Sequence, residues 1–164
     1  MPPLPPSPPI GYHPAVTLPP PSHGVIADGA HHLMLRVYFE DTDTAGIVYH
    51  ASYLRFMERG RTEMLRAAGI DHGAAVAAGL GAYAVHDMTI RWHRPAVLDD
   101  VLRVTSRLTR VRAAACSIAQ DIWRGDTLIT TATLTAAFLA PDGRPRRQPA
   151  EWMLIFNNLQ EHAG

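Results

Sequence analysis

The stretch Arg36-Val-Tyr-Phe-Glu-Asp-Thr-Asp-Thr-Ala-Gly-Ile-Val-Tyr-His50 decides the fold, because it leads from a strand through a tight turn into a long helix. Residues 33–39 are rich in Val, Tyr and Phe, which favours a half-buried strand. From His50 to Ala68, apolar side chains recur at spacings of three and four, and Gly69 follows as a C-terminal stop. The pattern predicts one helix of about five turns.

The turn between this strand and this helix combines acidic side chains with unpaired peptide donors. Asp41 and Asp43 provide turn chemistry, Asp41 as a turn or cap residue, and Gly46 can adopt backbone angles that other residues resist. The first backbone amides of a helix have no intrahelical partner, so they can hold an anion or a developing oxyanion. We expect these amides to be those of Val48, Tyr49 and His50.

Two motifs resemble a known family. Asp43-Thr-Ala-Gly-Ile-Val-Tyr-His50, followed by Tyr53 and Glu58-Arg-Gly-Arg-Thr-Glu63, resembles the signature of hot-dog-fold acyl-CoA thioesterases. The nearest types are 4-hydroxybenzoyl-CoA thioesterase and, closer, the small thioesterase encoded with the Tol-Pal envelope system. Arg94-Pro-Ala-Val-Leu-Asp-Asp100 is a second match, and the resemblance covers residues 33–149.

The resemblance implies roles for individual residues. Asp43 becomes the catalytic carboxylate, acting as nucleophile or general base, and the amide of His50 polarises the thioester carbonyl. The Tol-Pal-associated type also has a His, here His50, and a Tyr four residues before the Asp, a position that is Phe39 in this chain. Tyr38 lies on the opposite face of the predicted strand and replaces that hydroxyl only with a change of register. As alternatives, Asp43 only caps the helix and His50 is an ordinary, partly buried histidine.

The remaining site residues are expected to contact substrate. Coenzyme A carries phosphates, so Arg side chains should lie at the mouth of the pocket, unless they are only solvated loop charges. Gly46, Val48, Tyr49 and Tyr53 would line the site, with Arg112 and Arg146 at its mouth. The expected partner is an acyl-CoA, with an acyl carrier protein as the alternative thioester carrier.

The rest of the chain predicts an α+β domain. A short helix or lid is expected within residues 71–80, strands at residues 82–92, 101–110, 113–123 and 127–139, and a final helix from Pro149. The expected fold is a hot-dog fold, an antiparallel sheet of about five strands wrapped around one long central helix. Gly60 inside that helix costs about 1 kcal/mol relative to Ala, which indicates close packing against a strand. An open sheet edge favours a homodimer, and the resemblance implies sites between subunits and pairing of dimers into tetramers.

Composition excludes several other functions. The 164 residues suit one domain, and a formal net charge of zero gives no electrostatic reason to bind nucleic acid. All 15 basic residues are Arg, which rules out lysine nucleophiles. The single cysteine, Cys116, is expected to be a small buried side chain. No stretch reaches the length of a membrane span or has the form of a secretory signal, and we expect a cytoplasmic protein.

The N-terminal segment differs from the rest. Residues 1–33 hold 10 of the 14 prolines, all between Pro2 and Pro21, and are expected to form a disordered tail before a domain at residues 34–160. Translation from Met34 would remove this tail. A docking arm for a proline-binding partner is the alternative.

Neither a metal nor another cofactor is expected. Residues 41–46 begin like a calcium loop, but Ala45 stands at the third ligand position and Ser52 at the terminal Glu position. The competing functions are a non-catalytic module that binds acyl-CoA or an acyl carrier and a dehydratase of hydroxyacyl thioesters, which the motif resembles less well.

Overall fold

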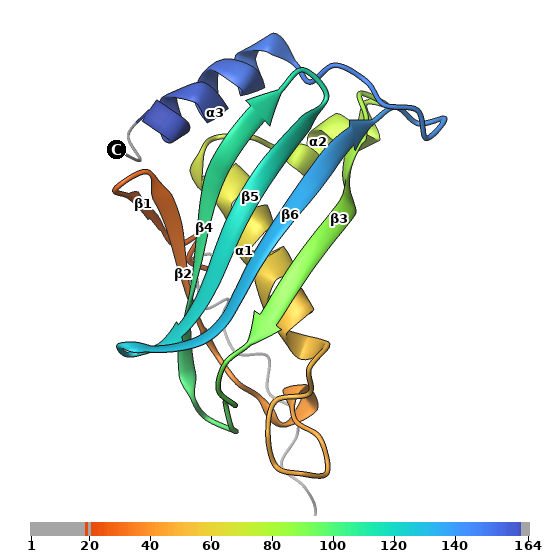
Figure 1. The fold of residues 1–164 in the computed structure, drawn as a ribbon. Helices are drawn as coiled ribbons and strands as arrows, with labels where there is room; N and C mark the ends of the chain where they lie inside the picture. The colour runs from red at the N-terminus through yellow and green to blue at the C-terminus, as the bar shows by residue number, and fades with distance from the viewer. Residues whose placement is uncertain (1–18, 20, 162–164) are drawn as a thin grey trace, which may run out of the picture.

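The fold is a six-stranded antiparallel sheet wrapped along one long helix (Figure 1). The computed structural model describes residue 19 and residues 21–161. The sheet order is β1-β2-β4-β5-β6-β3. Its strands are β1 (Val25–Ala27), β2 (Ala30–Arg36), β3 (Ala82–Trp92), β4 (Val101–Arg112), β5 (Ala115–Arg124) and β6 (Thr127–Leu139). The expected α+β architecture is therefore confirmed, with one strand more than the five that were predicted.

The central helix α1 (Ser52–Ala67) packs its apolar stripe against the sheet. The buried positions follow the helical spacing of three and four: Tyr53, Phe56, Met57, Gly60 and Met64. Gly60 lies where the helix comes nearest to the sheet, because an added Cβ would stand 2.7 Å from Val104 Cγ1 and 3.1 Å from Ser106 Oγ. The close packing predicted for Gly60 is confirmed.

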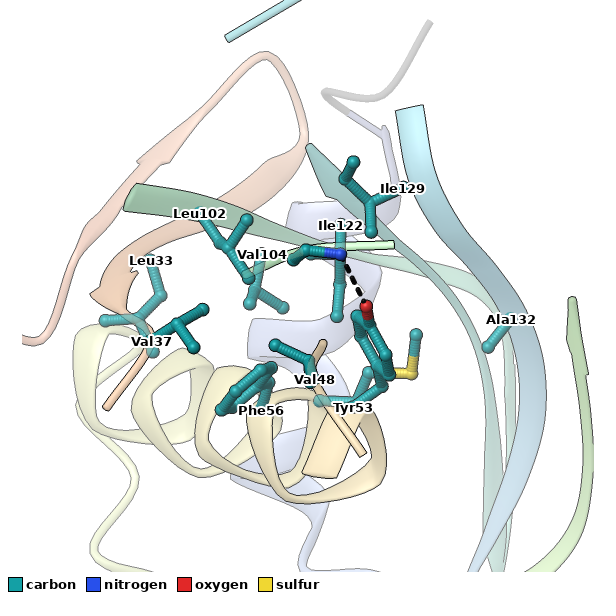
Figure 2. Packing of buried hydrophobic residues seen from close by; sticks show 12 residues of the cluster. Leu33, Val37, Val48, Tyr53, Phe56, Leu102, Val104, Ile122, Ile129 and Ala132 are labelled. Carbon is teal, nitrogen blue, oxygen red and sulfur yellow. Dashed lines mark hydrogen bonds between the residues drawn. The ribbon is translucent and has the colours of Figure 1, made fainter. Parts of the chain in front are cut away.

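Two apolar clusters stabilise the two ends of the molecule. One packs Val37, Val48 and Phe56 against Leu102 and Ile122, at the end that carries the Asp43 turn (Figure 2). The other lies under α2 (His72–Ala77) and α3 (Ala150–Glu161) and includes Met64, Phe138, Trp152 and Phe156. The turn with Asp43 therefore packs against the core, and this packing restricts the movement of the turn.

The later elements agree with their sequence patterns. β3 and β6 have the predicted bounds, and β4 and β5 differ from prediction by one or two residues at one or both ends. The helix predicted from Pro149 begins at Ala150, and the short helix predicted within residues 71–80 is α2. None of the helices in the described part of the chain is long and apolar enough to cross a membrane.

The predicted domain boundary at residue 34 falls inside β2. Residues 25–33 belong to a β-hairpin in which Asp28 and Gly29, both with positive φ, form the turn. Ala30, His31 and Leu33 are buried, so they are part of the domain. The dipeptide Asp28-Gly29 could have indicated a hairpin, but the nearby prolines led to the prediction of a tail. Residues 1–18 and 20, where the proline-rich tail was expected, lie outside the described residues.

The strand predicted to reach Phe39 ends earlier, at Arg36. Residues 39–41 form a short 3₁₀ helix, η1, instead. The Asp41 carboxylate accepts a hydrogen bond from the Tyr38 amide at 2.9 Å, and such local bonds compete with strand pairing. Asp41 is 1 % exposed, which confirms its predicted role as a turn and cap residue.

Candidate active site

Asp43 begins a tight turn that the surrounding chain holds on two sides. The Asp43 amide donates to the Ile47 carbonyl at 2.9 Å, and the Gly46 amide donates back to the Asp43 carbonyl at 3.0 Å. Gly46 has a φ of +75°, a conformation that glycine adopts without strain. Thr42 pairs with Val48 in an isolated antiparallel bridge, so the two ends of the turn are locked together.

The two sequence motifs meet at this turn. Ile47 forms a bridge with Val97, and the Val48 amide donates to the Ala96 carbonyl at 2.8 Å. The loop from residue 93 to residue 100 therefore forms the wall beside the Asp43 turn. Because both ends of this wall continue into strands β3 and β4, its position is fixed by the sheet.

One oxygen of Asp43 is bonded within the turn, and the other has no partner among the described residues. Oδ1 accepts a hydrogen bond from the Ala45 amide at 2.9 Å. Within the described residues, Asp43 makes no ion pair, and its side chain is exposed to a groove. This arrangement orients the carboxylate and leaves Oδ2 available for chemistry.

Of the three amides that were expected to be available, two are used by the protein itself. The Val48 amide bonds to Ala96, and the Tyr49 amide donates to the Asp41 carbonyl at 2.9 Å. The expectation was wrong for these two because α1 begins at Ser52, after a turn that closes from the Ser52 amide to the Tyr49 carbonyl. The His50 amide has no backbone acceptor in the described part of the chain, so it is the donor that a substrate can use.

A groove brings the reactive groups together. Its lining includes Asp43, Val48, His50 and Tyr53 from the turn and helix, and Trp92, His93, Arg94 and Pro95 from the end of β3. The His50 ring lies between two aromatic rings, 4.4 Å from that of Tyr49 and 6.1 Å from that of Trp92 by ring centroids. Gly46 and Tyr49 do not line the groove: Gly46 shapes the turn and Tyr49 packs on His50.

Tyr53 supports the groove wall from within. Its side chain is 2 % exposed, and its hydroxyl accepts a hydrogen bond from the Ala96 amide at 3.0 Å, drawn as a dashed line in Figure 2. Burial raises the pKa of Tyr53, so the hydroxyl stays protonated. Tyr53 therefore joins α1 to the loop that holds Val48 in place.

We expect Tyr53→Phe to lower the free energy of unfolding by about 1–3 kcal/mol, because the buried Ala96 amide loses its acceptor. Urea unfolding followed by circular dichroism measures the change. Tyr49→Phe is the matched control, since the Tyr49 hydroxyl bonds to no described residue and its loss should matter by less than about 0.5 kcal/mol. Equal stability of the two variants would contradict the role assigned to Tyr53.

The structure places Arg112 and Arg146 far from Asp43 within one chain. Arg112 ends β4, where its neighbours in the sheet are the start of β5 and the end of β6, whereas the groove lies by the end of β3 and the start of β6. The Arg146 guanidinium donates to the Leu80 carbonyl at 2.8 Å. Within one chain these two residues do not line the groove of Asp43, because they lie at the other end of the sheet; their predicted place at the mouth of a site between subunits stays a prediction.

Neither aromatic residue considered for the missing Tyr position reaches the groove. Tyr38 is 59 % exposed and Phe39 82 % exposed, and neither is among the groove residues. Within one chain, neither the Tyr38 hydroxyl nor the Phe39 ring therefore lines the groove.

Cys116 is unsuited to nucleophilic chemistry. Its thiol is buried, donates to the Gln148 side-chain carbonyl at 3.4 Å, and has its pKa raised to about 11 by burial. The prediction that it is a small buried side chain is confirmed.

Trp92 and Arg94 are groove residues that sequence reasoning missed. Arg94 belongs to the second family motif, residues 94–100, but nothing in the spacing of this motif indicates contact with Asp43. The sequence feature that could have indicated this contact is that each of the two motifs lies next to the end of a predicted strand.

Comparisons with known proteins show the family and the fold. Residues 37–154 match the model of the thioesterase-like superfamily. The acyl-CoA thioester hydrolase YbgC of Escherichia coli is 39% identical over 117 residues, covering 70% of this chain and 87% of that protein. A probable thioesterase from Bartonella henselae is 38% identical with a TM-score of 0.70, covering 73% of this chain and 99% of that structure. A 4-hydroxybenzoyl-CoA thioesterase structure, 22% identical with a TM-score of 0.70 over 77% of this chain and 98% of its own, shares the hot-dog fold.

Proposed function

Because this chain belongs to the thioesterase-like superfamily and is a thioester hydrolase, we propose that Asp43 and the His50 amide hydrolyse the thioester of a short-chain or aromatic acyl-CoA. An acyl carrier is the alternative donor of the acyl group. One observation carries the proposal: in the part of the chain that the structure describes, a carboxylate oxygen without a partner and a backbone amide without an acceptor belong to residues of the same groove.

The two groups have complementary tasks. Hydrolysis makes the carbonyl oxygen negative, and a preorganised amide donor stabilises that charge better than water does. The His50 amide supplies this donor at the entry to α1, where the positive end of the helix dipole adds to the effect. The negatively charged Asp43 carboxylate acts at the carbonyl carbon, as a general base or as the nucleophile.

The bond changes follow from these positions. Asp43 takes a proton from water as the water oxygen attacks the carbonyl carbon, or its own oxygen attacks to form an anhydride that water then cleaves. In both routes the carbon–sulfur bond breaks, the sulfur leaves as a thiolate and the acyl group leaves as a carboxylic acid. A thiol with a pKa near 8.5 leaves readily, so the reaction needs no dedicated acid.

We propose that the imidazole of His50 orients substrate. The rings of Tyr49 and Trp92 pack beside this imidazole and restrict its orientation in the groove. We assign it to binding beside the thioester, with the backbone amide of the same residue polarising the carbonyl.

A second copy of the chain completes the proposed site. β3 is the outermost strand at one edge of the sheet, eleven residues long, with Val85 46% and Trp92 45% exposed. A long unpaired edge favours pairing with another strand. Antiparallel pairing of two β3 strands would place the Asp43 end of one copy beside the Arg112 end of the other, so Arg112 can serve the partner's groove. Light scattering after gel filtration should give the mass of two chains or of four, and a monomer would refute this assembly.

A panel of acyl-CoA thioesters with a thiol-detecting reagent tests the proposed function. We expect release of CoA from several short-chain or aromatic substrates, at rates that depend on acyl shape, because pocket contacts differ by about 1–3 kcal/mol per methylene. Binding of acyl-CoA without thiol release would show a binding module and overturn the proposed chemistry.

A further inference from the structure

Arg94 is a cation held beside the reactive groups without a partner. Its guanidinium forms no hydrogen bond or ion pair with any described residue, although it belongs to the same groove as Asp43. Two other arginines near this end are engaged: Arg36 donates to the Asp99 carbonyl at 3.1 Å, and Arg124 pairs with Asp100 at 2.6 Å. The lining of the groove therefore includes the negative Asp43 and the positive Arg94, which do not form an ion pair with each other.

The backbone around Arg94 is rigid. The amides of His93 and Arg94 both donate to the Ile129 carbonyl, at 2.8 and 3.2 Å, and Pro95 restricts the backbone of Arg94, the residue before it. The Nε2 atom of the His93 ring is hydrogen-bonded to the Thr131 hydroxyl at 3.0 Å. The backbone of Arg94 is therefore fixed, while the five donors of its guanidinium have no partner among the described residues.

We propose that Arg94 binds an anionic group of the thioester substrate and thereby selects charged over neutral thioesters. This inference rests on the proposed function of the groove. Guanidinium groups bind phosphate and carboxylate oxygens through paired N–H donors, and both groups occur in substrates of this class. The anion is a phosphate of the CoA moiety or a carboxylate at the end of the acyl group, and the substrate that loses affinity in an Arg94 variant tells which.

The test compares Arg94→Met with the full-length wild-type protein on three thioesters. The first is the CoA thioester of an uncharged acyl group, the second is the same acyl group on N-acetylcysteamine, which has no phosphate, and the third is a carboxyl-ended acyl group on N-acetylcysteamine. We expect KM to rise about tenfold for at least one charged substrate, while KM and kcat for the neutral N-acetylcysteamine ester stay within twofold. A rise for the acyl-CoA identifies phosphate, and a rise for the carboxyl-ended ester identifies carboxylate.

Two controls separate this role from other effects. Arg103→Met removes an equal charge from β4, where the Arg103 guanidinium lies over the Trp123 ring, and it should leave all three KM values unchanged. Arg94→Lys should recover part of the lost affinity, since it restores the charge without the paired donors. Unchanged KM for both charged substrates, or an equal rise for the neutral ester, would overturn the proposal for Arg94. Failure of the wild-type protein to cleave any of the three thioesters would instead refute the proposed function.

Discussion

We expect Asp43→Asn to lower kcat for thioester hydrolysis by at least about a hundredfold while the protein remains folded, because an amide neither attacks the carbonyl carbon nor takes a proton from water. The turn should survive the change. The asparagine side-chain oxygen can still accept the Ala45 amide that Asp43 Oδ1 now accepts at 2.9 Å. Release of CoA measured at saturating substrate reports kcat, and circular dichroism reports folding.

Asp142→Asn is the matched control for this variant. Asp142 is also exposed and also accepts the amide two residues later, that of Arg144, at 3.0 Å, but it lies after β6 and outside the groove. Both variants remove one negative charge from the same kind of turn. If Asp43→Asn retained the activity of Asp142→Asn, the carboxylate would have no part in the reaction.

Gly60→Ala lowers the free energy of unfolding by about 2 kcal/mol, because the new methyl group overpacks the interface between α1 and the sheet. The added Cβ would stand 2.7 Å from Val104 Cγ1, and Val104 is fully buried and has no room to move. This cost exceeds the gain of about 1 kcal/mol that Ala normally brings to a helix interior. Chemical denaturation measures the difference.

Gly73→Ala provides the comparison in a helix with free space. The Cβ added at Gly73 in α2 would be 3.4 Å from Asp71 Oδ1, an ordinary contact. This variant should be as stable as the parent or more stable by up to about 1 kcal/mol. Stabilisation by Gly60→Ala to the same extent would mean that α1 does not approach the sheet as closely as described.

The periodic parts of the fold could be predicted from sequence. The bounds of β3 and β6 follow from runs of β-branched residues closed by turn residues, and α1 follows from its apolar spacing. Where local bonds override a pattern, prediction failed. Asp41 ends the strand early by capping the Tyr38 amide, and the Asp28-Gly29 turn builds a hairpin inside what composition suggested was a tail.

The candidate site was predictable only where it is local in sequence. Asp43 and His50 belong to one turn and one helix start, so a motif suffices to bring them together. The contributions of Trp92 and Arg94 depend on the register of β3 against β6, and the placement of Arg112 depends on which end of the sheet β4 reaches. Such long-range relations are set by strand pairing, and no local pattern encodes them.

The most direct test of the catalytic geometry is a crystal structure of the Asp43→Asn variant with an intact acyl-CoA thioester. We predict a carbonyl oxygen about 2.7–3.1 Å from the His50 backbone nitrogen, with the side chain of residue 43 facing the carbonyl carbon. A thioester bound with its carbonyl outside this groove, or with no contact to the His50 amide, would contradict the mechanism.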